Sequence, residues 1–356
     1  MYKSYNLKIT PFDNMFFRDA HTFQKEMSHY IPTLRQPYPS TIYGALLSCF
    51  LRQGLFSNIL KDIQGKKLLD ETLKEHFRIK NVFLIFKDEV FLKAPLDTFY
   101  NDKKVQIGRY KSCNGVFQCH TPVYDKEELN QVDNHYISLK EYKEHYLLNK
   151  NIHSINLLSE KDVFSSHTKI GIELNAVTGS VKEKHLYKIE QISFKDKDWS
   201  YFLQVDLKED TGKIKDDVLK LGGENKLAYL KTLPSQDILE EDYNNIVINE
   251  KTYYTDKIKM ILTTPMKNDT YNALCEKVNV IGQVTGKSLT IGGYNMLKNS
   301  QKKLTKAIPS GSILILQSNT FNRKSIKEIT KTIKSQYTAD FKGFDQFIIA
   351  PLHKEG

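Results

Sequence analysis

The segment PYPSTIYGALLSCF, residues 37–50, decides the fold that we predict for this chain. Its prolines oppose a helix that extends backward, and Ser40 is a good N-cap residue. After Ser40, apolar residues recur at the spacing of one helical face: Ile42, Leu46, Cys49 and Phe50. We therefore predict an amphipathic helix that packs on a sheet and ends at Gly54.

Apolar patterns on both sides of this helix predict strands. They alternate or run continuously at 3–10, 82–86, 170–174, 186–194, 201–207, 258–263, 312–317 and 347–350. A second helix, capped by Asn322, places on one face Ile326, Ile329, Ile333 and Tyr337. Strands and helices alternate without a long βαβ run or a Walker-type loop. This order fits an α+β fold of two ferredoxin-like (RRM-like) domains, each βαββαβ, with insertions.

The length of 356 residues predicts two domains. We expect an N-terminal domain at 1–210, with a long insertion at about 95–165 and a hairpin at 166–194, and a C-terminal domain at 211–356. The insertion is polar and weakly periodic, so we interpret it as a segment without a core of its own. The hairpin tip, residues 175–184, carries Lys182 and Lys184.

Composition excludes several protein classes. A hydrophobic content of 40% predicts a globular chain, and no apolar run approaches the roughly 20 residues that span a bilayer. The N-terminus has no apolar signal core, so we predict a cytoplasmic protein. Four cysteines make no disulfide framework, and the spacing of Cys113, Cys119 and His120 is unusual for zinc. We therefore expect no metal and no cofactor.

The charge of the chain is unevenly distributed. The whole sequence carries 52 basic and 42 acidic residues, but the fifty-one residues 277–327 contain nine Lys or Arg and no acid. The remainder holds 43 basic and 42 acidic residues. The same segment contains five glycines, which allow a backbone to approach a ligand closely. This combination favours contact with nucleic-acid phosphates, although a solvated lysine-rich face explains the charge equally well.

Five motifs occur in a fixed order. They are FFRD at 16–19, PxPSTIYGAL at 37–46, HTKIGI at 167–172, LGGENK at 221–226, and IGGY at 291–294 followed by KKL at 302–304 and IPSGS at 308–312. In this order they resemble the family of third subunits of the Cmr complex, the type III-B CRISPR RNA-guided effector. The resemblance covers about residues 5–316. Family members usually have Arg at positions 169 and 226 and often Trp at 294, where this chain has Lys, Lys and Tyr.

The resemblance implies a RAMP protein of two ferredoxin-like domains that is not an enzyme. Such subunits hold the 5′ repeat-derived tag of the CRISPR RNA. They dock onto the large palm-domain subunit and adjoin the backbone subunit of the filament. The hairpin at 166–194 resembles the RAMP thumb, although an ordinary hairpin remains an alternative.

The same resemblance and the residue chemistry together predict an RNA-binding set. Helix N-termini, close glycine backbones and cationic side chains are groups that hold single-stranded RNA. The set comprises Arg18, Ser40, Thr41, His167, Lys169, Lys182, Lys184, Gly222, Gly223, Asn225, Lys226, Gly292, Gly293, Tyr294, Lys298, Lys302 and Lys303. Structural roles remain open for several members: an ion pair of Arg18 with Asp19, and tight turns at the glycine pairs.

Two other functions remain open from the sequence. RAMP relatives include metal-independent endoribonucleases that process CRISPR RNA, and such chemistry needs a general acid and base. The candidates here are His21, His29 and His167, but no close pair of such groups is visible in the sequence. A scaffold that binds only proteins, with solvated lysines, is the third possibility.

Overall fold

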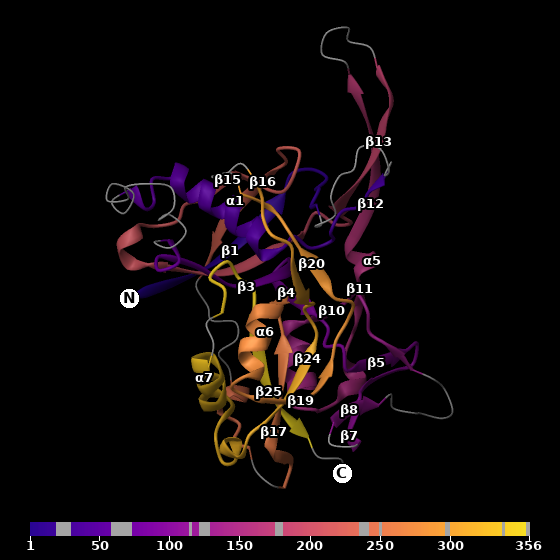
Figure 1. The fold of residues 1–356 in the computed structure, drawn as a ribbon, viewed down its shortest axis with the longest axis vertical. Coiled ribbons are helices and arrows are strands. Elements are labelled where there is room, and N and C mark those ends of the chain that lie inside the picture. The colour runs from indigo at the N-terminus through magenta and orange to yellow at the C-terminus, as the bar shows by residue number, and fades with distance from the viewer. Residues whose placement is uncertain are drawn as a thin grey trace. The chain divides into compact units, whose positions relative to one another are not determined.

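The computed structural model describes residues 1–18, 30–57, 73–113, 116–120, 129–174, 181–234, 242–248, 251–295, 300–336 and 339–353. The chain forms two compact units, each assembled from three segments (Figure 1). The first unit comprises 1–79, 161–234 and 290–305, and the second comprises 80–160, 235–289 and 306–356. This division differs from the predicted boundary at 210/211, because the chain passes between the units several times.

Strands of the first unit form a sheet in the order β14-β1-β16-β15. The strands are β1 (Tyr2–Pro11), β14 (Trp199–Lys208), β15 (Asp217–Lys220) and β16 (Leu227–Leu233). β1 pairs antiparallel with β14 and with β16, as Ile9 opposite Tyr201 and opposite Leu230 shows. β1 and β14 confirm two strands predicted from the sequence. A 3-10 turn, η3 (Glu209–Thr211), follows β14.

Helix α1 (Pro39–Arg52) buries the predicted apolar face in the first unit. Tyr43 stacks on Phe77 with ring centroids 4.7 Å apart, and Phe50 meets the same ring edge-on at 5.2 Å. The helix begins two residues earlier than predicted: Tyr38 is its N-cap and Pro39 its first residue, so Ser40 is not the cap. Proline suits the first helical position, because its missing N–H would have no partner there. Gly54 follows the C-cap with φ of +79°, as predicted.

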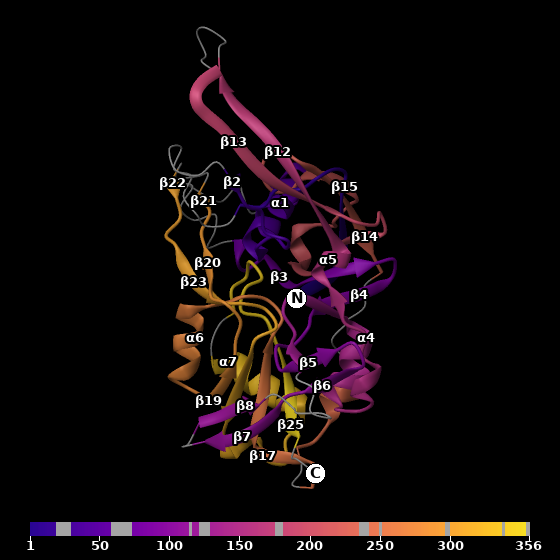
Figure 2. The same ribbon diagram turned by 90° about the vertical axis from the view of Figure 1, so that its right-hand side faces the viewer.

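A long antiparallel hairpin also belongs to the first unit (Figures 1 and 2). It consists of β12 (Phe164–Leu174) and β13 (Val181–Phe194), and a short helix, α5 (Glu160–Val163), precedes it. β2 (Tyr30–Ile31) pairs parallel with β13. The predicted hairpin is confirmed, but Lys182 and Lys184 lie within β13 rather than in its tip, and their side chains are outside the described residues. A two-strand ribbon, β21 (Tyr294–Asn295) with β22 (Ser300–Gln301), completes the unit.

The second unit contains a four-stranded antiparallel sheet in the order β19-β24-β17-β25. Its elements follow one another as β17 (Tyr253–Leu262), α6 (Asn268–Cys275), β19 (Asn279–Val284), β24 (Ile313–Gln317), α7 (Ile326–Gln336) and β25 (Phe347–His353). Ile326, Ile329 and Ile333 of α7 are buried, as predicted. The cap is Ser325 rather than Asn322: Ser325 Oγ accepts from the Glu328 N–H, and the Glu328 carboxylate accepts from the Ser325 N–H.

The insertion at 95–165 lies mostly in the second unit and contributes to its core, contrary to the prediction of a segment without one. Tyr136 and Tyr142 are fully buried, and Asp97 is buried with them. The polar composition concealed this core, because tyrosine hydroxyls let large rings be buried beside polar partners. The helical elements of this segment are α4 (Leu139–Glu141), the π-helix η1 (Tyr142–Leu147) and η2 (Ile152–Ser154).

Short strands make up the rest of the second unit. β3 (Phe77–Phe86) begins in the first unit and continues into the second from Lys80. Its last residues, Leu84 to Phe86, pair with β4 (Glu89–Lys93), and β4 pairs in turn with β10. The other strands are β5 (Thr98–Asn101), β6 (Lys104–Ile107), β7 (Arg109–Cys113), β8 (Val116–His120), β9 (Asn130–Gln131), β10 (His135–Ser138), β11 (Leu158–Ser159), β18 (Met266–Lys267) and β23 (Thr305–Ile308). One more strand, β20 (Leu289–Ile291), has one residue in the second unit and two in the first. Two 3-10 turns are η4 (Asp242–Asn245) and η5 (Asn319–Phe321). Among the described residues, no helix is long and apolar enough to span a membrane.

Candidate nucleic-acid interface

The turn at 221–226 lies against the segment at 16–18. Gly222 has φ of +78°, and a Cβ placed on it would lie 2.6 Å from the Phe16 carbonyl oxygen. The Gly223 N–H donates to that carbonyl at 2.8 Å. Two motifs separated by some 200 residues therefore meet, and glycine is required at 222 for both conformation and space. This contact positions Arg18, which follows Phe17 directly.

Arg18 is the exposed cation of this region. Among the residues that the structure describes, it makes no ion pair. Asp19, the alternative partner considered from the sequence, lies outside the described residues. An exposed guanidinium is well suited to phosphate, because its planar donor set can bind two oxygens at once.

Lys169 on β12 is not free for RNA in this conformation. Its ammonium lies 3.0 Å from the Glu224 carboxylate, which also accepts from the Gln191 side chain at 2.8 Å. Glu224 has φ of +55°, and this left-handed turn brings its carboxylate to the hairpin. The contact joins the predicted motif at 167–172 to the predicted motif at 221–226.

Lys226 is likewise paired. Its ammonium lies 2.9 Å from the Asp13 carboxylate, and the hydrogen bond from Lys226 lowers the pKa of Asp13. The side chain of Lys226 is 19% exposed, whereas that of Asp13 is 65% exposed. Asn225, with φ of +54°, accepts a hydrogen bond from Lys220 at 3.2 Å. The two lysines that stand where the family has arginine are therefore held by local carboxylates.

His167 lies on the exposed side of β12, where its Nε2 is 2.8 Å from Ser193 Oγ. A serine hydroxyl holds the ring orientation but is a poor general acid or base, because its pKa is far from neutrality. His21 and His29, the other candidates for acid–base chemistry, lie outside the described residues.

A charge cluster on the hairpin was not predicted from the sequence. The Glu190 carboxylate accepts from Arg35 at 2.9 Å, from Ser166 Oγ at 2.7 Å and from the Thr33 N–H at 3.3 Å. Burial raises the pKa of Glu190, but these hydrogen bonds outweigh burial and leave the pKa below its usual value. The cluster ties residues 30–35 to β13. Its members are polar residues without periodic spacing, so no sequence pattern marked them.

The beginning of α1 meets the glycine-rich segment. The Tyr38 hydroxyl donates to the Thr290 carbonyl at 3.2 Å, and Ser40 and Thr41, which follow in the first turn of α1, are half-buried. The Thr41 N–H is already bonded to the Tyr38 carbonyl at 2.8 Å. Two further motifs of the predicted set therefore share one neighbourhood.

The glycine pair 292–293 opens the β21–β22 ribbon. Gly293 has φ of +149°, and its carbonyl accepts from the Lys302 N–H at 2.8 Å. The side chains of Lys302 and Lys303 are exposed. Tyr294 lies in β21, but its side chain, like all of Lys298, is outside the described residues.

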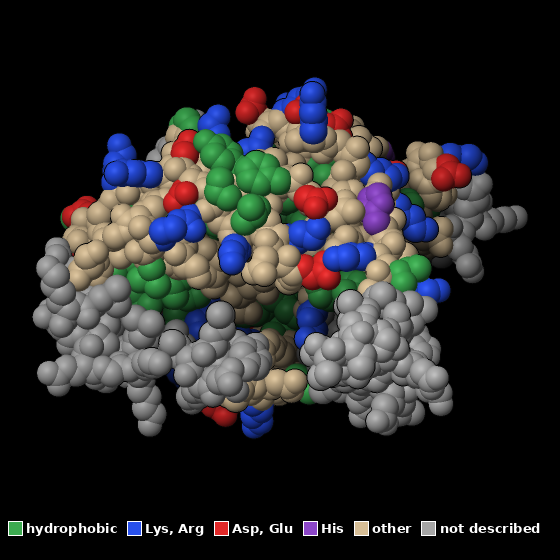
Figure 3. Space-filling model, turned by 90° about the horizontal axis from the view of Figure 1, so that it is seen from above, with side chains coloured by type: hydrophobic (Ala, Val, Ile, Leu, Met, Phe, Trp, Pro, Cys, Tyr) green, Lys and Arg blue, Asp and Glu red, His purple; other side chains and the backbone are tan. Residues whose placement is uncertain are grey.

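All the predicted RNA-binding residues fall in segments of the first unit. The acid-free stretch 277–327 does not: its residues 290–305 belong to the first unit and the remainder to the second, so it is not one surface of one unit. Figure 3 shows acidic side chains among the lysines and arginines of the described face. Among the described residues, no group of His, Cys, Asp or Glu has the geometry to hold a metal ion.

Comparison with known proteins identifies relatives over the full fold. The CMR subunit Cmr3 of Saccharolobus solfataricus is 26% identical over 334 residues, which cover 89% of this chain and 88% of that protein. A chain of the cryo-EM structure of type III-B Cmr-beta bound to cognate target RNA is 18% identical, with a TM-score of 0.49 over 94% of this chain and 90% of that one. A chain of the Csm3–Csm4 subcomplex from a type III-A system is 14% identical, with a TM-score of 0.42 over 98% of this chain and 100% of that one.

The family model described as CRISPR-associated protein (Cas_Cmr3) matches residues 7–350, nearly the whole sequence. The match includes every segment of both units that carries the motifs discussed above. The chain therefore belongs to the Cmr3 family of CRISPR-associated proteins.

Proposed function

We propose that this chain is a non-catalytic RNA-binding subunit of a type III-B CRISPR (Cmr) effector complex. It grips the 5′ repeat-derived tag of the CRISPR RNA and docks onto the large palm-domain subunit and the adjoining backbone subunit. The observation that carries this proposal is the family match over residues 7–350. In the first unit, the motifs at 16–19, 167–172 and 221–226 contact one another, and the motif at 37–46 contacts the residue that precedes the motif at 291–294; both contacts support the place of the RNA site.

A RAMP architecture with ferredoxin-like domains is part of this proposal. In the second unit, the order β17-α6-β19-β24-α7-β25 is βαββαβ, and the sheet order places the first and third of these strands at the centre. This arrangement supports a ferredoxin-like description of that unit. The hairpin of β12 and β13 is the proposed thumb.

The proposed grip combines the exposed Arg18 guanidinium with several glycine backbones. Arg18 would contact phosphate, while Gly222, Gly223, Gly292 and Gly293 allow the strand to approach the main chain. The exposed Lys302 and Lys303 add electrostatic attraction. Because such contacts release counterions from RNA, the affinity would fall steeply with salt.

Binding of the purified chain, alone and with the large subunit, to CRISPR RNA with and without its 5′ tag tests this proposal. Measurements at two salt concentrations should show tag-dependent binding that the K302E/K303E variant loses. The matched control is K327E/K331E, which makes the same charge change on the exposed side of α7 in the second unit. Each lost phosphate contact should reduce the salt slope by about 0.7.

Equal binding with and without the tag would contradict tag recognition. An equal loss of RNA binding in both double variants would show that general electrostatic attraction, rather than a specific site, accounts for binding. RNA cleavage by the purified chain that disappears in H167A would contradict the non-catalytic role and favour a RAMP endoribonuclease.

A further inference from the structure

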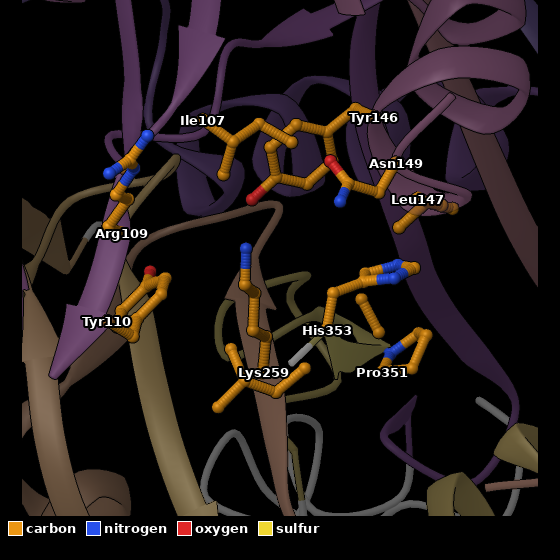
Figure 4. A pocket seen from close by; sticks show the side chains of 12 residues that line it. Ile107, Arg109, Tyr110, Tyr146, Leu147, Asn149, Lys259, Pro351 and His353 are labelled. Atoms are coloured by element: carbon orange, nitrogen blue, oxygen red, sulfur yellow. The ribbon is translucent and has the colours of Figure 1, made fainter. Parts of the chain in front are cut away.

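A cavity of about 290 Å³ lies in the second unit. Its walls come from the β6–β7 connection, the end of η1, β17 and β25, all within that unit. Figure 4 shows Arg109 on β7, Lys259 on β17 and His353 on β25 around one space. None of its lining residues belongs to the RNA-binding set predicted from the sequence.

Three residues that line the cavity, Lys259, Tyr110 and Tyr146, donate hydrogen bonds to one buried carboxylate. The Asp97 carboxylate is fully buried and accepts from Lys259 at 2.7 Å, from the Tyr110 hydroxyl at 2.8 Å and from the Tyr146 hydroxyl at 2.6 Å. Burial, followed by the charge of Asp97, raises the pKa of both tyrosines, so both remain protonated donors. The two tyrosine hydrogen bonds help to offset the desolvation penalty of burying the ion pair of Asp97 and Lys259. The cluster fixes two aromatic rings and one ammonium at the cavity.

Arg109 brings an additional positive charge to the opening. Its side chain is exposed and makes no ion pair with any residue that the structure describes. Because Asp97 neutralises Lys259, the charge that remains at the cavity is the single positive charge of Arg109. One monoanionic group, such as a phosphodiester, would balance it.

His353 presents an unsatisfied acceptor at the same cavity. Its ring hydrogen-bonds to the backbone of Leu147, whereas its Nε2 is buried and has no partner among the residues that the structure describes. Burial and then the charge of Lys259 lower the pKa of His353 to about 4, so the ring is neutral at pH 7. A neutral ring that donates through Nδ1 has a lone pair on Nε2. A buried acceptor without a donor is unfavourable, and a ligand that supplies an N–H would relieve this.

We propose that this cavity binds one nucleotide unit, with its phosphate on Arg109 and a base N–H donating to His353 Nε2. The volume is at the lower end of the range for ligand pockets, which suits a single nucleotide. A π-helical turn contributes to the wall, and such turns are frequent at functional sites. The cavity itself is independent of the proposed tag grip in the first unit. That the bound nucleotide belongs to an RNA strand, rather than being a free nucleotide, rests on the proposed function.

Calorimetric titration of the full chain with AMP, CMP, GMP and UMP tests the proposal, with adenosine and ribose 5-phosphate as partial ligands. Saturable binding of at least one mononucleotide is expected, and each partial ligand should bind at least tenfold more weakly. R109A should weaken binding by about tenfold or more, because it removes a charge-assisted hydrogen bond. H353F, which keeps an aromatic ring but removes the acceptor, should weaken it similarly.

The matched control is K111A. Lys111 is exposed on the same strand, β7, but does not line this cavity. Binding by K111A should stay within about twofold of the parent, since only general electrostatics change. No saturable binding of any mononucleotide at millimolar concentration would overturn the proposal. Equal weakening by K111A and R109A would also overturn it.

Repeating the titration in the presence of CRISPR RNA separates the two sources of nucleotide. Loss of the mononucleotide signal would identify the RNA strand as the occupant, and an unchanged signal would identify free nucleotide; both outcomes support the cavity. The K302E/K303E variant should bind the mononucleotide normally. A failure of tag recognition in the first unit is therefore distinguishable from a failure of this cavity.

Discussion

The Lys169 ammonium and the Glu224 carboxylate lie 3.0 Å apart, and this pair joins the hairpin to the turn at 221–226. The lysine is 53% exposed, so the pair lies at the surface and contributes about 0–1 kcal/mol to stability. Its main consequence is electrostatic: Lys169 can bind a phosphate only if its ammonium leaves the Glu224 carboxylate.

Replacing Glu224 by Gln should therefore strengthen RNA binding. The substitution leaves Lys169 without its counterion, and the salt slope should steepen by about 0.7 if one more phosphate is neutralised. Fluorescence anisotropy at several salt concentrations would measure both effects. E209Q is the control, because Glu209 is also exposed in the first unit and loses the same charge. A steeper slope in both variants would show that the pair has no special role.

Two glycine-to-alanine changes should act in opposite directions. G222A should destabilise the chain, because its φ of +78° and the Phe16 carbonyl 2.6 Å away both oppose a side chain. G44A should stabilise it by about 1 kcal/mol, because Gly44 lies in α1 with nothing within 4 Å of the added Cβ. Urea unfolding measures both changes. Stabilisation by G222A would contradict the close contact between 222 and 16.

Breaking the buried pair of Asp97 and Lys259 should be costly. K259M leaves a fully buried carboxylate without its counterion and should cost about 3–5 kcal/mol. The double variant D97N/K259M should recover part of this loss, since a neutral amide needs no counterion and its one oxygen can still accept from Tyr110 or Tyr146. Urea unfolding compares the variants. Equal instability of the single and double variants would show that the lost packing of Lys259, rather than its charge, dominates.

Stability should fall as the pH drops from about 6.5 toward 4. The unfolded chain protonates His353 near its ordinary pKa of about 6.5, whereas the folded chain does so only near 4. Protons therefore favour the unfolded state within this window, and above it the ring is neutral in both states. The titratable groups that line the same cavity as the ring are Arg109, Tyr110, Tyr146 and Lys259, and the Tyr253 ring meets it edge-on.

Urea unfolding at pH 7.5, 6.5, 5.5 and 4.5 would measure this dependence. The H353F variant should lose less stability than the parent across the window, because it has no proton to take up. Parallel profiles for the two proteins would contradict a lowered pKa of His353 in the folded chain.

Local patterns in the sequence correctly predicted the structural features that are set by residues close together in the chain. The face of α1, its end at Gly54, the buried face of α7 and the strands of the hairpin were all predicted. They follow from side-chain periodicity and from glycine's access to positive φ, which are properties of short segments. The resemblance of the motifs to a family was confirmed by the match over residues 7–350.

Local patterns failed where a competing cap residue lay two or three positions away, as at the starts of both helices. Tyr38 and Ser325, not Ser40 and Asn322, precede the first helical residues. Proline at the first helical position moved the start of α1, and the reciprocal bonds of Ser325 and Glu328 set the start of α7.

The sequence by itself determined the family, the helix faces and the glycine-dependent turns. Tertiary structure alone decided which charges are paired. Asp97 and Lys259 are 162 positions apart, and Lys169 and Glu224 are 55 apart. Composition counts each of these lysines as a free cation. Whether an ammonium meets a carboxylate or remains available to a phosphate depends on which distant strands the fold brings together, because charge pairing acts over a few ångströms of space rather than along the chain.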